Sequence, residues 1–234
     1  MINTKIKGNI KNRKELERIV QNNTVLHSYL FLGENGIGKK EIAKEFAKQI
    51  LCLAHKDKCD CKSCICFETD NHPDFQLIND EGDTIKISTI REMIATVYEK
   101  PILSDKKIYI INDADKMTKE AQNSLLKTLE EPPEYTIIIL IASNTDMLLN
   151  TIKSRCTKII FEKLTTQELK EALESKINLD ANISEKMFEF FDGSVGKALK
   201  ILEKKEIYDA LDKFIETIEK TNKIDFLTKT KEIF

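Results

Sequence analysis

A glycine-rich stretch, residues 33–40, has the residue types and spacing of a phosphate-binding loop. It follows an apolar run, Tyr29 to Leu32, and leads into a helical pattern, so a strand, a tight turn and a helix are expected in that order. Glycines would let the backbone turn its N–H groups inward, and a lysine would reach the outer phosphates. The expected phosphate-binding residues are Gly33, Gly36, Gly38 and Lys39.

The residue after this lysine departs from the usual pattern. A phosphate-binding loop normally has Ser or Thr there, whose hydroxyl holds Mg²⁺, but this chain has Lys40. An ammonium group cannot ligate a cation, so the stretch indicates a nucleotide-binding fold more strongly than a hydrolysing enzyme. Bound ATP or ADP without turnover stays open, and so does a glycine turn that only joins strand to helix.

Acidic residues after a later strand are the second candidate for nucleotide chemistry. In nucleotide-binding folds, carboxylates at the end of a buried strand hold Mg²⁺ and help to activate water. The apolar run Ile108 to Ile111 is followed by Asn112 and Asp113, where a competent hydrolase would carry two adjacent acids. Asp113 is therefore expected to belong to a degenerate phosphate and magnesium site.

Five of the six cysteines fall within residues 52–66, and this clustering indicates a metal site rather than disulfides. Thiolates bind Zn²⁺ tetrahedrally, and four of them leave no open position for catalysis, so a structural zinc is expected. Free or redox-active thiols are the alternative. The expected ligands are Cys52, Cys59, Cys61 and Cys64, with Cys66 able to replace Cys59 and His55 as a further option.

The order of apolar patterns predicts the elements that position these residues. Strands are expected at residues 29–32, 75–78, 108–111, 136–142 and 158–161, alternating with helices that include residues 10–20, 39–53 and 119–130. Such alternation predicts an α/β fold with a parallel sheet. Ser88 or Thr89 is expected to cap the helix before the third strand, and His72 either shapes the turn before the second strand or joins the metal.

After Glu162 the pattern becomes purely helical, beginning with a capping box at Thr165 to Glu168. We therefore expect two domains. The first, residues 1–163, is a nucleotide-binding-like domain with a zinc module at 52–66, and the second, residues 164–234, is a small helical lid.

The composition and the charge of the chain disfavour some classes of function. The 234 residues carry a net charge of −2, so no global basic excess is present to hold nucleic acid, and any DNA contact is expected to be local or made through partners. The N-terminus lacks an apolar core of signal-peptide length, and the longest apolar run, Ile137 to Ala142, is too short to cross a bilayer. A cytoplasmic protein without membrane contacts is expected.

Several motifs together resemble one family. They occur in a fixed order and spacing, and they are His27 to Gly33, the cysteine cluster, Asn71 to Asp74, Leu125 to Pro133 and Ser154 to Cys156. This combination, within roughly residues 8–202, is similar to the clamp-loader branch of the AAA+ ATPases, and most of all to non-motor subunits of the bacterial DNA polymerase III clamp loader. The resemblance implies an AAA+ P-loop sheet with a zinc-binding insert and a helical lid.

The resemblance also implies roles for particular residues. Arg155 would be an arginine finger that acts in trans on a neighbour's ATP, the alternative being an ordinary salt-bridging arginine. Asn112 and Asp113 fall where motor subunits carry their acidic pair, and Gly196 stands where they carry a nucleotide-sensing arginine. With Lys40, these departures suit a stationary subunit with little or no ATPase of its own.

The implied partners are the gamma/tau motor and delta subunits in a hetero-oligomer, with the sliding clamp and primed DNA reached through the complex, during replication in the bacterial cytoplasm. Family members carry a third, helical collar domain, for which this chain has room only for the beginning, after about Lys204. The sequence leaves two other functions open. One is an ATP-hydrolysing motor subunit, and the other is a stand-alone zinc-containing DNA-binding module with salt-sensitive affinity, which the acidic net charge disfavours.

Overall fold

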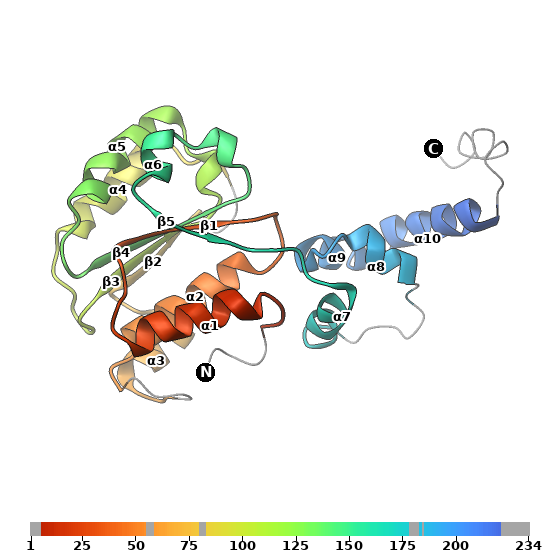
Figure 1. The fold of residues 1–234 in the computed structure, drawn as a ribbon, viewed down its shortest axis with the longest axis horizontal. Coiled ribbons are helices and arrows are strands. Elements are labelled where there is room, and N and C mark those ends of the chain that lie inside the picture. Colours follow the sequence, from red (N-terminus) through yellow and green to blue (C-terminus); the bar gives the residue numbers. More distant parts are fainter. Residues whose placement is uncertain (1–5, 55–58, 80–82, 178–182, 184, 221–234) are drawn as a thin grey trace. The chain divides into compact units, whose positions relative to one another are not determined.

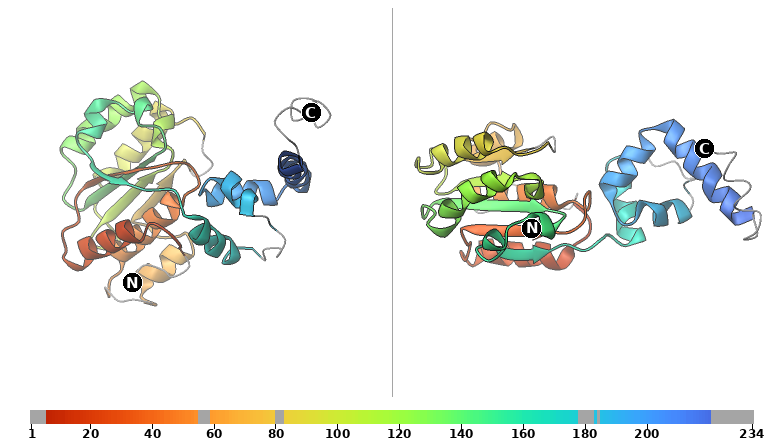
Figure 2. Two further views of the ribbon diagram at one scale, coloured as in Figure 1. Left: turned by 45° about the vertical axis from the view of Figure 1, so that its right-hand side comes forward. Right: turned by 90° about the horizontal axis from the view of Figure 1, so that it is seen from above.

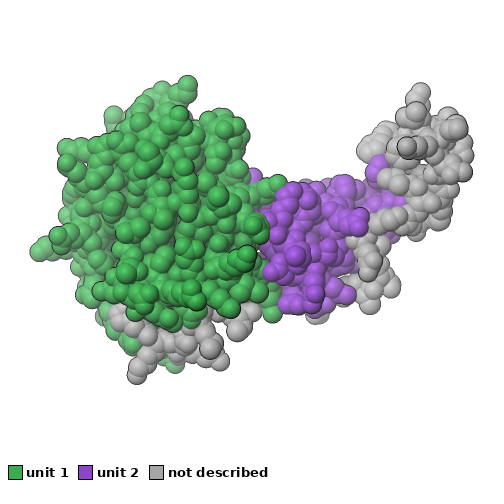
Figure 3. Space-filling view, viewed as in Figure 1, with its two compact units in different colours: residues 1–34, 38–162 green, residues 35–37, 163–234 purple. Residues whose placement is uncertain are grey.

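The computed structural model describes residues 6–54, 59–79, 83–177, 183 and 185–220. The chain divides into two compact units (Figure 3). The first comprises residues 1–34 and 38–162, and the second comprises residues 35–37 and 163–234.

The first unit is built on a five-stranded sheet in the order β2-β3-β4-β1-β5, in which all neighbouring strands run parallel. The strands are β1 (Ser28–Leu32), β2 (Phe75–Ile78), β3 (Lys107–Ile111), β4 (Thr136–Ala142) and β5 (Thr157–Ile160). Every residue of β1, β3 and β4 is buried, because helices cover both faces of the sheet. The predicted parallel α/β fold is confirmed.

Helices lie on both faces of this sheet (Figures 1 and 2). On one face lie α1 (Ile10–Gln21), α2 (Lys39–Leu51) and α3 (Lys62–Glu68), and on the other lie α4 (Ile87–Val97), α5 (Lys119–Glu130) and α6 (Asn150–Lys153). Ile90 and Met93 of α4 and Leu125 of α5 pack with side chains from the central strands in a continuous apolar core. This core fixes the position of the strand ends, and the candidate nucleotide-site residues follow these ends.

Helix starts follow local caps where nothing stronger competes. Thr118 caps α5 by accepting a hydrogen bond from the Ala121 N–H. The predicted cap of α4 at Ser88 or Thr89 is wrong, since the helix already begins at Ile87. The segment just before it is fixed by backbone hydrogen bonds of Ile85 with Lys116 and Thr118, so a tertiary contact sets the start of α4.

The helix that follows the glycine-rich loop is shorter than predicted. It ends at Leu51 rather than at residue 53, because Cys52 adopts an extended conformation (φ −68°, ψ 117°). The chain thereby turns away from α2 and enters the cysteine-rich segment directly.

The second unit is helical and contains α7 (Thr166–Glu174), α8 (Glu185–Phe191), α9 (Val195–Leu202) and α10 (Lys205–Lys220). The predicted capping box is confirmed: Glu168 N–H donates to Thr165 Oγ1, and Thr165 N–H donates to Glu168 Oε2. Phe188 and Phe191 of α8 pack edge to face in its small core. Among the described residues of both units, no helix combines the length and the apolar character needed to cross a membrane.

Candidate functional site

The glycine-rich loop leaves the inner strand β1 and enters α2 through two residues in the left-handed region. Gly36 has φ 79°, and Gly38, which is the N-cap of α2, has φ 92°. Residues with a side chain rarely adopt such angles, so glycine is required at both positions. The loop therefore has the strand, turn and helix arrangement that its sequence predicted.

Lys39 is buried and hydrogen-bonded to its own loop. Its Nζ donates to the carbonyl oxygens of Gly33 and Glu34, at 2.6 Å each. Burial lowers the pKa of Lys39 to about 8, although the negative charges of Asp115, Asp113 and Glu34 oppose the shift. Two of the three N–H donors of Lys39 are used in these contacts, and the third is available for another acceptor.

Both side chains at the expected acidic pair have local partners. The amide nitrogen of Asn112 donates to the Asn79 carbonyl oxygen, and the amide of Asn79 donates in return to the Asn112 carbonyl oxygen. Asp113 has φ 49°, and its carboxylate forms an ion pair of 3.2 Å with Lys116. These contacts join the ends of β2 and β3 and give Asn112 a structural role.

Asp115 is a residue of this site that the sequence reasoning missed. Its Oδ2 accepts hydrogen bonds from Ser143 Oγ (2.9 Å) and from the N–H groups of Ser143 and Asn144, which follow β4. It is also the carboxylate that most strongly opposes the lowered pKa of Lys39. The sequence signal for this residue is the spacing of Asp113 and Asp115, two residues apart, rather than a pair of adjacent acids.

The tip of the loop, residues 35–37, belongs by its contacts to the second unit. There the Gly196 N–H donates to the Gly36 carbonyl oxygen (2.9 Å), and Ser194 Oγ donates to the Asn35 carbonyl oxygen (2.8 Å). A Cβ atom on Gly196 would lie 2.9 Å from Gly36 Cα. Backbone packing therefore excludes any side chain at position 196.

Arg155 lies between α6 and β5, and its backbone is fixed by β1, because Ser28 Oγ donates to its carbonyl oxygen (2.7 Å). Its guanidinium donates to the Thr151 carbonyl oxygen (2.8 Å) and pairs with Glu130 at the end of α5. The side chains of Arg155 and Glu130 are 31% and 46% exposed. Arg155 is thus held by an ion pair at the protein surface, within reach of solvent.

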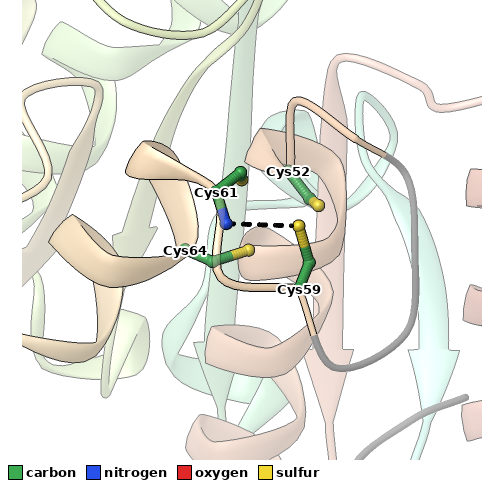
Figure 4. A group of neighbouring side chains, drawn as sticks. All are labelled: Cys52, Cys59, Cys61 and Cys64. Atoms are coloured by element: carbon green, nitrogen blue, oxygen red, sulfur yellow. Dashed lines mark hydrogen bonds between the residues drawn. The ribbon is translucent and has the colours of Figure 1, made fainter.

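Four cysteines form a compact group, drawn in Figure 4: Cys52, Cys59, Cys61 and Cys64. Their sulfur atoms all lie within 4.8 Å of one another. Tetrahedral Zn²⁺ with Zn–S bonds of about 2.3 Å would place its sulfurs about 3.8 Å apart, so this group could hold a metal ion after a small contraction. Cys66 is outside the group, and His55 lies outside the described residues.

Secondary structure brings these thiols together. Cys52 is the C-cap of α2, Cys61 is the N-cap of α3, and Cys64 lies in the first turn of α3. Cys59 is held in place by the Cys61 N–H, which donates to its sulfur (3.4 Å). Burial raises the pKa of Cys61, but interaction with the backbone N–H groups of Cys64 and Leu53 outweighs it and lowers the pKa to about 6. This thiol is therefore suited to the deprotonated form that metals bind.

The parallel sheet, the glycine-rich loop after its strand β1 and the helical second unit define a P-loop protein of the AAA+ class. A solved structure of a DNA polymerase III gamma subunit-related protein from Thermotoga maritima has the same fold, with a TM-score of 0.52 and 21% sequence identity. The likeness covers 95% of this chain and 77% of that one.

The sequence places the chain within this class. The family model for "DNA polymerase III, delta subunit" matches residues 8–165. The chain is 38% identical over 162 residues to the DNA polymerase III subunit delta' of Bacillus subtilis (strain 168), covering 68% of this chain and 49% of that protein. It is 31% identical over 218 residues to the subunit gamma/tau of Mycoplasma genitalium, covering 89% of this chain and 36% of that protein.

The chain belongs to the DNA polymerase III delta subunit family, in its delta-prime branch of clamp-loader proteins, which confirms the resemblance seen in the sequence. It spans about half the length of its delta' relative from Bacillus subtilis and about a third of its gamma/tau relative from Mycoplasma genitalium.

Proposed function

We propose that this chain is a non-motor subunit of a bacterial DNA polymerase III clamp loader and acts in cytoplasmic DNA replication. In this role it joins gamma/tau and delta subunits, supplies Arg155 in trans to the ATP site of a neighbouring motor subunit, and helps to load the sliding clamp onto primed DNA. The observation that carries the proposal is the placement of Arg155, whose backbone is anchored to β1 while its guanidinium rests on the exposed Glu130. A guanidinium held in this way can exchange its carboxylate partner for a phosphate.

The state of the chain's own phosphate loop supports the non-motor part of the proposal. Lys40 replaces the Mg²⁺-binding hydroxyl, and the side chain of Asn112 is bonded to the Asn79 carbonyl oxygen. Gly196 cannot be replaced by the arginine of motor subunits without a backbone collision. We therefore propose negligible ATPase for this chain. ADP or ATP bound without turnover at Gly33, Gly36, Gly38, Lys39 and Asp113 is compatible with the proposal.

The metal part of the proposal is one structural Zn²⁺ per chain, held by Cys52, Cys59, Cys61 and Cys64. A four-thiolate site has no open coordination position, so the ion would stabilise the segment around α3 and take no part in the reaction.

A motor subunit is the second candidate, because the gamma/tau relative from Mycoplasma genitalium matches 89% of this chain. ATPase activity of the isolated full-length protein separates the two candidates. The non-motor role predicts no turnover above background, whereas about 1 s⁻¹ or more, as in ordinary enzymes, would favour the motor. Family membership gives no support to a stand-alone DNA-binding module.

The in-trans role is tested by reconstituting the complex with Arg155→Ala in the full-length protein. An arginine finger contributes on the order of 10³-fold or more to the rate at its site, so one ATP per complex should survive the first DNA-triggered turnover. Arg91→Ala, which removes an exposed arginine on α4, is the matched control and should behave like wild type. Equal single-turnover yields for Arg155→Ala and wild type, at equal incorporation, would refute the in-trans role.

A further inference from the structure

Four polar side chains lie buried beside the cysteine group, and none of them is a thiol. They are Ser63, His72, Asp74 and Ser104, called the buried relay below. Burying polar groups is unfavourable unless each finds hydrogen-bond partners. Here their contacts run in an unbroken series from the Leu51 carbonyl oxygen, next to Cys52, to residues 102–104.

The relay begins at the carbonyl oxygen of Leu51, which is the last residue of α2 and precedes Cys52. Ser63 Oγ donates to this oxygen at 2.6 Å, and Ser104 Oγ donates to it at 2.8 Å. Ser63 itself lies in α3, directly before Cys64. Its hydroxyl therefore joins the two chain segments that carry the thiols, without being a ligand.

His72 holds the Ser63 hydroxyl in this orientation. The Asp74 N–H donates to His72 Nδ1 (3.1 Å), so Nδ1 carries no proton, and the neutral ring carries its proton on Nε2. Nε2 lies 2.8 Å from Ser63 Oγ and donates to it, which leaves the Ser63 proton for Leu51. Both ring nitrogens are engaged, so His72 positions the segment around the metal site and is not a ligand.

Asp74 forms the far end of the relay. Its fully buried carboxylate accepts three backbone hydrogen bonds, from the N–H groups of Ile102 (2.6 Å), Leu103 (2.7 Å) and Ser104 (2.8 Å). These bonds fix the segment 102–104, where the Ile102 side chain is 80% exposed. A segment that reaches the surface at Ile102 is thus tied through buried groups to the end of α2, directly before Cys52.

We propose that the buried relay positions the thiols for the metal and couples metal occupancy to the conformation of residues 102–104. A bound ion would hold the end of α2 against α3, which keeps Ser63 on the Leu51 carbonyl and, through His72 and Asp74, keeps the 102–104 backbone in place. Loss of the ion would free α3, break the Ser63 contact and loosen the segment. The relay requires the proposed metal site but is independent of the proposed role in clamp loading.

The positioning role is tested by Zn²⁺ affinity, measured by competition with a chromophoric chelator in the full-length protein. Ser63→Ala keeps all four thiols, yet we expect its affinity to fall about 10-fold, the lower end of the range for groups that bond to the ligands directly, because Ser63 acts through the backbone that carries them. Ser124→Ala is the matched control, because the Ser124 hydroxyl donates to a carbonyl within its own helix, α5, and its affinity should be unchanged. Equal affinities of the two variants would overturn the positioning role.

The coupling is tested without any substitution, by amide hydrogen exchange of the wild-type protein with and without Zn²⁺. We expect the amides of residues 102–104 to exchange faster after the metal is removed, whereas the β4 amides stay protected. Equal protection of residues 102–104 in both forms would overturn the coupling. If the wild-type protein binds no Zn²⁺, the metal site itself is refuted and the relay with it, whereas normal binding with no effect at residues 102–104 refutes the coupling alone.

Discussion

Lys39 is the lysine that the phosphate-binding pattern predicts, but its hydrogen-bond partners in the structure are carbonyl oxygens of its own loop. Its position in the loop follows the phosphate-binding pattern, but its ammonium group is buried and bonded to the carbonyls of Gly33 and Glu34. A buried ammonium group is disfavoured relative to one in water, which is why its pKa is lowered to about 8.

This lowered pKa gives a testable pH dependence of stability. Between pH 8 and 10.5 the unfolded chain still binds the Lys39 proton and the folded protein releases it. The free energy of unfolding of the wild type should therefore rise across this window relative to Lys39→Met, and below pH 8 the difference should be constant. Urea unfolding of both proteins at several pH values measures it, and parallel pH profiles would contradict the lowered pKa.

The sequence could predict which residues form the glycine-rich loop and which thiols cluster, because both depend on short spacings along the chain. It could not predict the role of Asp115, whose partners Ser143 and Asn144 lie 28 and 29 residues away and meet it only where β3 and β4 end side by side. The contacts of His72 likewise depend on Ser63 and Ser104, which different segments supply.

At the scale of elements, central strands were more predictable than helix starts. β4 is a run of seven buried residues rich in isoleucine, and its pattern has no competing interpretation once a parallel sheet is expected. The start of α4 is set by the pairing of Ile85 with Lys116 and Thr118. No residue close to α4 in the sequence indicates that contact. The start of α9 is set locally, by the Ser194 side chain that accepts a hydrogen bond from the Lys197 N–H, but the glycine at position 196 is explained only by packing against Gly36.

The packing of α9 predicts that Gly196→Ala is destabilising although alanine is the better helix former. The added Cβ would lie 2.9 Å from Gly36 Cα, and a backbone atom cannot move aside as a flexible side chain can. We expect a loss of about 1–3 kcal/mol in the free energy of unfolding, the usual range for an overpacked site. Lys200→Ala, at an exposed position of the same helix, is the control for urea unfolding. A stability gain from Gly196→Ala would show that the loop tip does not pack as described.

For the whole molecule, the metal is expected to contribute to stability, because binding to the folded state alone shifts the unfolding equilibrium. Chelator treatment should lower the melting temperature, and Cys52→Ser should reproduce that loss with less than one Zn²⁺ per chain. Cys66→Ser should keep both the metal and the melting temperature, because Cys66 lies outside the four-thiol group. Elemental analysis and thermal unfolding check this, and loss of metal from Cys66→Ser would instead favour the alternative ligand set.

Strand β1 also sets a fixed length inside the molecule. Ser28 at its start is bonded to Arg155, and the glycine-rich loop begins directly after Leu32 at its end. Five residues of strand span about 16 Å, and β1 is buried and paired on both edges, so it has little freedom to stretch or bend. If Arg155 serves a neighbour's nucleotide, β1 fixes the distance between the Arg155 backbone and the chain's own glycine-rich loop. The neighbour's nucleotide site and this loop would then keep a constant spacing.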